Sequence, residues 1–154
     1  MSKNIEDYLN EHHVHFEKIP HERTYTAQET AASAHVRGRD FAKSVIVKVD
    51  DQLVMMVLPA HYRTDLDFIR RMAGAGTAVL AGEAEFKDLF PDCEVGAMPP
   101  FGNLYNVDVW VDESLMWEES LVFNAGSHTE LIKIAASDFK DLVHPKIVRF
   151  PTGL

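Results

Sequence analysis

The chain lacks several features that would place it in particular classes of protein. Its 154 residues include a single cysteine, Cys93, which excludes an internal disulfide and a zinc site built from several cysteines. No apolar run approaches the roughly 20 residues that a transmembrane helix needs. The first ten residues lack the apolar core of a signal peptide. We therefore expect one soluble domain over residues 1–154, in the reducing cytoplasm and without membrane contact.

Positive charge is scarce, and it is unevenly distributed. The chain carries 15 Lys and Arg against 24 Asp and Glu, which gives a net charge of −9. Residues 72–132 contain one basic side chain, Lys87, and eleven acidic ones, whereas residues 37–71 contain seven basic and five acidic side chains. Because phosphate binding needs clustered Lys and Arg, a general nucleic-acid binder is excluded. A small, locally basic face is still compatible with this charge distribution.

The motifs of several common site types are also missing. Gly74-Ala-Gly76 has no third glycine and follows a predicted helix, so we interpret it as a helix C-cap and not as a dinucleotide-binding loop. No Gly-x-Ser-x-Gly elbow occurs. The carboxylates next to Cys93 are expected to raise the pKa of its thiol. His12, His13 and His15 have no carboxylate at a recognised ligand spacing, so we predict neither a metal nor another cofactor.

Hydrophobic patterning predicts a mixture of helices and strands. The clearest element is a hairpin over residues 42–58, in which two apolar, β-branched strands flank Asp50-Asp51-Gln52. Thr26 and Glu29 form a capping box before an Ala-rich helix that runs to His35, and Asp65 caps a later helix. Further helices are predicted at 5–12, 83–90 and from 137, and strands at 77–80, 104–112, 120–126, 130–135 and 147–150. This order lacks the regular alternation of a parallel sheet, so we predict an α/β fold of α+β type, with a mixed, mostly antiparallel sheet surrounded by helices.

Three segments carry groups that are suited to chemistry. Lys43 opens the first strand of the hairpin, near Arg37 and Arg39, although a solvated surface lysine would fit the pattern as well. In the loop over residues 96–102, prolines restrict the backbone conformation, and glycines allow backbone N–H groups to approach a ligand closely. The alternative is that this loop is only a tight structural connection between two elements. The turn over residues 124–128 either holds His128 over a pocket or only joins two strands.

Together these segments resemble the YbaK/prolyl-tRNA-synthetase-associated editing domain. The similarity rests on Lys43, the Gly96-x-x-x-Pro100 loop and the run FNAGSHTELIKI over residues 123–134, in the family's order across roughly residues 20–145. The resemblance implies a barrel-like sheet and a free-standing, trans-editing hydrolase of mischarged aminoacyl-tRNA. It implies that Lys43, Gly96 and His128 are catalytic and that the substrate is bound by Ser44, Pro100, Phe101, Gly102, Gly126 and Ser127.

The chemistry of editing agrees with these residue types. An aminoacyl ester is already activated, so a positioned water and a stabilised oxyanion suffice, and backbone N–H groups of the Gly96 loop can donate to that oxyanion. Lys43 can hold the terminal phosphate or polarise the ester region as a point charge. His128 orients the water or the amino group, or is structural. The resemblance implies that a ribose hydroxyl of the substrate assists the water. Because an added methylene gives only about 1–3 kcal/mol of discrimination, we expect a second, size-excluding site for a small amino acid such as Ala, Ser or Cys.

A hypothesis from a different class is a non-catalytic or regulatory protein that keeps this fold and binds a small molecule or another protein. The acidic segment 72–132 motivates it, as does the Ser127-His128 turn, where many family members have a Gly- or Ser-rich run. For an editing enzyme, the charge distribution predicts weak contact confined to the acceptor end of the tRNA. Help from an aminoacyl-tRNA synthetase or an elongation factor is then expected, with the chain itself a monomer or weak dimer.

Overall fold

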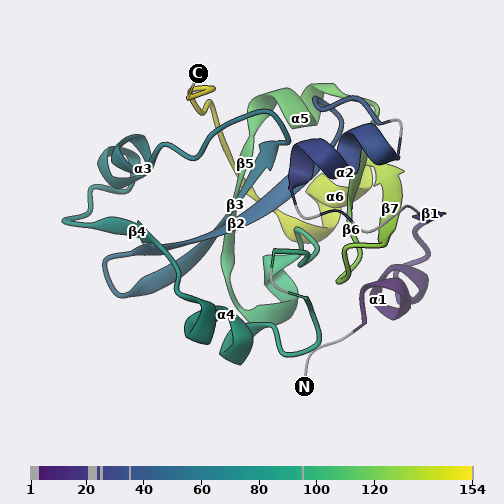
Figure 1. Cartoon of the computed structure of the whole chain (residues 1–154), viewed down its shortest axis with the longest axis horizontal. Coiled ribbons are helices and arrows are strands. Elements are labelled where there is room, and N and C mark those ends of the chain that lie inside the picture. Colours follow the sequence, from purple (N-terminus) through teal and green to yellow (C-terminus); the bar gives the residue numbers. More distant parts are fainter. Residues whose placement is uncertain (1–3, 21–23, 25, 35, 95, 154) are drawn as a thin grey trace.

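The computed structural model describes residues 4–20, 24, 26–34, 36–94 and 96–153 (Figure 1). None of the helices in these ranges combines the length and apolarity needed to cross a membrane. In chain order the elements are α1 (Ile5–Glu11), β1 (Glu17–Pro20), α2 (Ala27–Ser33), β2 (Ala42–Val49), β3 (Gln52–Pro59), α3 (Leu66–Ala73), β4 (Ala78–Leu80), α4 (Glu83–Leu89), the 3₁₀ helix η1 (Gly102–Tyr105), β5 (Asp108–Asp112), α5 (Glu113–Trp117), β6 (Ser120–Asn124), β7 (Glu130–Ala135), α6 (Ala136–Val143) and β8 (Lys146–Val148).

The described strands form two sheets that mix antiparallel and parallel pairing. The three-stranded sheet has the order β1-β7-β6 and is antiparallel throughout. The five-stranded sheet has the order β4-β2-β3-β5-β8; β2 pairs antiparallel with β3 and β4, whereas β5 pairs parallel with β3 and β8. The predicted α/β fold with a mixed, mostly antiparallel sheet is therefore confirmed.

The main hydrophobic core lies between the two sheets. It combines Met55 and Val57 of the five-stranded sheet with Phe123 and Ile132 of the three-stranded sheet, and Phe139 of α6 closes it. An isolated parallel bridge between Phe41 and Val122 joins the sheets at one edge. Because both sheets turn their apolar faces inward and share this bridge, they enclose the core as a partial barrel.

Local signals in the sequence account for the best-predicted elements. In the hairpin, Val49 pairs with Gln52, and Asp50 supplies the positive φ (51°) that the tight turn requires. Asp65 accepts a hydrogen bond from the Phe68 amide at 3.0 Å and starts α3, which ends at the left-handed Gly74. Thr26 accepts from the Glu29 amide at 3.1 Å, as expected of a helix cap. The predicted end of that helix, His35, lies outside the described residues.

The region around residues 102–117 differs from the prediction. The expected strand over 104–112 is wrong in its first half, because residues 102–105 form the η1 turn and Asn106 is left-handed (φ 57°), so that β5 begins only at Asp108. The sequence reading also missed α5, where Asp112 accepts from the Ser114 amide at 3.1 Å and begins the helix. A helix of five residues is too short to show a helical period in the sequence.

Candidate functional site

The Gly96 loop and the turn after β6 lie against each other. The Glu94 amide donates to the Gly126 carbonyl at 2.8 Å, and the Gly126 amide donates to the Ala97 carbonyl at 2.9 Å. The carboxylate of Glu94 also accepts from the His128 amide at 2.7 Å. Two segments that are about thirty residues apart in the sequence are therefore held together by backbone groups.

The glycines in both segments have a conformational role. Gly96 has φ +81° and Gly126 has φ +103°, which side chains other than glycine adopt only with strain. A Cβ atom built on Gly96 would lie 3.8 Å from Cε1 of His128, so the imidazole borders the exposed Gly96 backbone directly. The backbone of the Gly96 loop and the ring of His128 thus face one small region.

His128 and Ser127 are fixed by the turn that carries them. His128 is only 6% exposed, so its ring is held against neighbouring groups and not free in solvent. The hydroxyl of Ser127 lies 3.2 Å from that of Thr129 and accepts from the Thr129 amide at 3.4 Å. Ser127 therefore stabilises the turn that positions His128.

Lys43 lies at a separate hollow of about 560 Å³. This hollow is bordered by the start of α2, by residues 60–64 after β3 and by Leu80 of β4. The Lys43 ammonium donates to the Tyr62 carbonyl. Burial lowers the pKa of Lys43, because the half-buried position disfavours its charged form.

The strands bring Lys43 close to the second segment. At the Phe41–Val122 bridge β2 runs parallel to β6, and the Val122 amide donates to the Asp40 carbonyl at 3.0 Å. Lys43 and Asn124 each lie two residues beyond this bridge, which brings the start of β2 against the middle of β6. Neither Gly96 nor His128 is among the described residues that line the hollow beside Lys43, so the structure does not place Lys43 in one hollow with these two residues.

Four of the predicted substrate-binding residues have buried groups or shape the loop itself. Phe101 is fully buried and packs its ring on Phe123 and Phe139, 5.6 Å from each between ring centroids. A Cβ atom on Gly102 would lie 2.6 Å from the Val107 carbonyl oxygen, so this glycine permits a close backbone approach. Pro100 is buried, as are the residues on either side of it in the loop. The Oγ atom of Ser44 is also buried. The predicted contacts of Phe101 and Gly102 with substrate gain no support from these positions.

Polar groups at the ends of β3 and β6 were not predicted from the sequence. Asn124 is 8% exposed, and its Oδ1 has no hydrogen-bond partner within the described part of the chain. It lies on the same face of the sheet as Leu131 and Val122, which α2 covers. His61 and Tyr62 line the Lys43 hollow. These residues lie at or directly after the ends of apolar strands. That position could have indicated a role in a site, because side chains at strand ends line clefts in many sheets.

The structure describes the surroundings of Cys93 and His12, for which no catalytic or metal-binding role was predicted. The pKa of Cys93 is raised as predicted, although burial is the main cause and the charge of Asp92 contributes less. His12 bonds the Tyr8 carbonyl through Nδ1 at 2.9 Å. Across the described ranges, no group of three or more His, Cys, Asp or Glu side chains could hold a metal ion.

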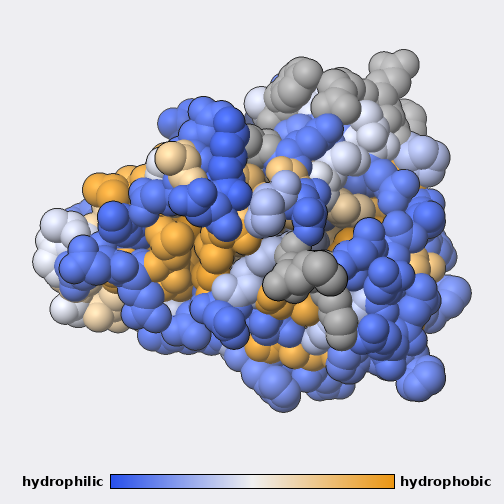
Figure 2. Space-filling view, turned by 90° about the horizontal axis from the view of Figure 1, so that it is seen from below, coloured by the Kyte–Doolittle hydropathy of each residue, from blue (hydrophilic) through white to orange (hydrophobic). Residues whose placement is uncertain are grey.

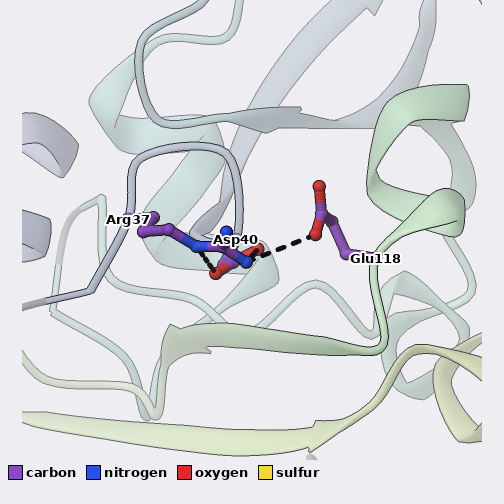
Figure 3. Close-up of polar contacts among 3 residues, drawn as sticks. All are labelled: Arg37, Asp40 and Glu118. Carbon is purple, nitrogen blue, oxygen red and sulfur yellow. Dashed lines mark hydrogen bonds and ion pairs between the residues drawn. The ribbon is translucent and has the colours of Figure 1, made fainter.

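Charged side chains fasten the loop that precedes β2. Arg37 binds Asp40 at 2.7 Å and Glu118 at 3.5 Å, so one guanidinium links this loop to the residue that follows α5 (Figure 3). Burial raises the pKa of Glu118, and the neighbouring carboxylate of Asp40 raises it further. The pKa of Arg37 is raised by its hydrogen bond to Asp40. We call these three residues the Arg37 brace.

Comparison with known proteins identifies the family. The model of the aminoacyl-tRNA editing domain matches residues 21–142. The chain belongs to the aminoacyl-tRNA editing domain family. Curated relatives include proline–tRNA ligases of Bacillus cereus (strain AH187) and Bacillus mycoides (strain KBAB4), each 25% identical over 99 residues. Those matches cover 64% of this chain but only 17% of each ligase.

Solved structures share the fold of this editing domain. One, described as "a putative trans-editing enzyme for prolyl tRNA synthetase", has a TM-score of 0.80 and 19% identity, covering 95% of this chain and 93% of that one. A scaffold protein used for computational epitope grafting has a TM-score of 0.81 and 18% identity, covering 98% of this chain and 96% of its own. At these identities the likeness concerns the fold alone. The resemblance stated from the sequence is confirmed by the family match.

Proposed function

We propose that the chain is a trans-editing hydrolase that deacylates mischarged aminoacyl-tRNA carrying a small amino acid. The observation that carries the proposal is the junction of the Gly96 loop with the Gly126–His128 turn, in a chain that matches the editing-domain model over residues 21–142. At this junction the exposed backbone of Gly96 lies beside the fixed imidazole of His128. Ester hydrolysis without a protein nucleophile needs N–H donors for the oxyanion and a group that orients the water, and this arrangement can supply both.

The proposed reaction is a hydrolysis of the ester between the amino acid and the terminal ribose. The oxygen of a water molecule attacks the carbonyl carbon, and negative charge develops on the carbonyl oxygen, where N–H groups of the Gly96 loop stabilise it. The bond between that carbon and the ribose oxygen then breaks, and a proton from the water ends on the ribose oxygen. The products are the free amino acid and the tRNA. A neighbouring ribose hydroxyl of the substrate assists the water.

Each proposed residue has a role that matches its surroundings. Lys43 offers an ammonium group at the edge of its hollow, where a phosphate can replace the Tyr62 carbonyl as its partner. His128 borders Gly96 and orients the water or the amino group of the substrate. Gly126 and Ser127 hold the turn, while Pro100, Phe101 and Gly102 anchor the far end of the loop in the core.

A deacylation panel tests this proposal. tRNAs charged with Ala, Ser, Cys and larger amino acids are incubated with the protein, and the remaining ester is measured over time. We expect hydrolysis of at least one ester of a small amino acid and a strong loss of rate in Lys43→Ala. Met72→Ala is the matched control, because Met72 is exposed on α3 and does not border the hollow of Lys43. Hydrolysis of none of the esters by the wild type contradicts the proposal and favours the non-catalytic alternative.

A further inference from the structure

Trp117 is unusually exposed for its size. It ends α5, and 73% of its surface is accessible, more than for any other large apolar side chain in the described part of the chain. The next residue, Glu118, belongs to the Arg37 brace, so the backbone beneath the indole is fastened to the loop before β2 (Figure 3). A large aromatic ring held in solvent on a fixed backbone is typical of a binding surface.

A second hollow lies beside Trp117 and adjoins the hollow of Lys43. It has a volume of about 300 Å³ and is bordered by Trp117, Arg149, Tyr62 and the C-terminal segment that ends at Thr152. Tyr62 also lines the hollow of Lys43, so the two hollows share a wall. The C-terminal segment, α5, α2 and the loop after β3 lie along the upper side in Figure 1.

The charges along this side favour an anionic ligand. Lys43, Arg63 and Arg149 border the two hollows, and the side chain of Arg149 is 86% exposed. Of the acidic groups that border them, Asp112 is buried and accepts from the amides of Ser114 and Phe150. Glu113 pairs with Arg149 at 3.5 Å. Three basic side chains thus border the two hollows against two acidic ones, in a chain whose net charge is −9.

We infer that this surface binds the single-stranded 3′ end of the tRNA. One base stacks on Trp117, backbone phosphates lie near Arg149 and Arg63, and the strand passes Tyr62 so that the terminal nucleotide reaches Lys43. Exposed aromatic rings flanked by arginine are the usual means of binding single-stranded RNA, because every base offers a face for stacking. The inference rests on the proposed deacylase function and extends it by assigning Trp117 as a residue that binds the RNA and does not touch the reacting ester.

Kinetics with a long and a short substrate test the inference. The substrates are an aminoacyl-tRNA that the wild type hydrolyses and the same amino acid esterified to adenosine alone. Loss of one base stack predicts that Trp117→Ala raises KM for the aminoacyl-tRNA about tenfold. kcat should stay unchanged, and so should the rate for the adenosine ester, which cannot reach Trp117. Trp117→Phe should restore most of the loss, and Met72→Ala should cause none.

Fluorescence provides a test that needs no turnover. The probe is an RNA hairpin that carries a single-stranded ACCA end, and the control is the same hairpin with a blunt end. We expect the ACCA hairpin to quench the tryptophan emission of the wild type and not that of Trp117→Phe, and the blunt hairpin to quench neither. Equal quenching by both hairpins, or none by either, overturns the inference and leaves a protein partner as the occupant of this surface.

The two proposals can fail separately. If the wild type hydrolyses aminoacyl-tRNA and Trp117→Ala has the wild-type KM, the RNA surface is wrong and the deacylase function stands. If the wild type hydrolyses neither substrate, the deacylase function itself is wrong.

Discussion

At the scale of single residues, Asn124 combines deep burial with an unsatisfied acceptor. A buried polar group without a partner destabilises the native state by about 1–3 kcal/mol, and native proteins keep few of them. Such a group at the end of β6, two residues before Gly126, is expected where a ligand donates the missing hydrogen bond. An aminoacyl ester has such a donor in its ammonium group.

Replacing Asn124 should therefore separate stability from activity. Asn124→Leu keeps the volume and removes the unpaired carbonyl oxygen, so we expect a change of less than about 1 kcal/mol in the free energy of unfolding. Deacylation should nevertheless fall. Thr30→Val is the matched control, since the Thr30 hydroxyl donates to the Thr26 carbonyl at 2.9 Å and its loss should cost about 1–2 kcal/mol. Urea unfolding measures both, and a larger loss in Asn124→Leu than in Thr30→Val contradicts the account.

The lowered pKa of Lys43 predicts a specific dependence on pH. Its folded pKa lies below the ordinary 10.5, so between these two values the unfolded chain binds more protons and stability rises with pH. Below the folded pKa the whole penalty for burying the charge is present. Lys43→Met should thus raise Tm at pH 7, and this advantage should shrink as the pH approaches 10.5. Thermal unfolding of both proteins at pH 7 and pH 10 measures the difference; a constant advantage would argue against burial as the cause.

At the scale of elements, the Arg37 brace connects the loop before β2 to the end of α5. Arg37→Ala leaves the carboxylates of Asp40 and Glu118 facing each other without their shared cation. The charge of Arg37 lowers the pKa of Glu118, so without Arg37 the pKa of Glu118 in the folded state rises further. The folded state then binds more protons than the unfolded chain, and stability is gained as the pH falls. We expect a lower Tm than wild type at pH 7 and a smaller deficit at pH 5. Arg70→Ala, which breaks an exposed pair with Asp67 on α3, should show no such recovery.

The elements that the sequence predicted well are those with a local cause. The hairpin over 42–58 followed from two β-branched runs around Asp50-Asp51, and α3 followed from Asp65 and Gly74 at its ends. The Phe41–Val122 bridge has no local signal, because it joins segments 81 residues apart through the packing of two sheets. Without that bridge, the approach of the start of β2 to β6 could not be foreseen. The same reason explains why Tyr62 and Trp117 were missed.

At the scale of the whole molecule, the distribution of charge limits how the protein can bind RNA. Polar side chains cover most of the side opposite α5, and an apolar area lies toward the end that carries α3 and β4 (Figure 2). Among the described residues, three basic side chains border the hollows of Lys43 and Trp117: Lys43, Arg63 and Arg149. Single strands release about 0.7 counterions for each phosphate contact, so these groups predict a slope of about −2 in log K against log salt. Titrations of the ACCA hairpin at several salt concentrations measure it, and a slope of about −5 or steeper would require a larger basic surface.

The rate of ester hydrolysis tests the central claim most directly. A tRNA mischarged with a small amino acid is incubated with wild-type protein, with Lys43→Ala and with Met72→Ala, and the remaining ester is followed over time. The account predicts rapid loss of the ester with wild type and Met72→Ala, and a rate near that of buffer alone with Lys43→Ala. Equal rates for wild type and Lys43→Ala, or no hydrolysis by the wild type of any ester of a small amino acid, would contradict it.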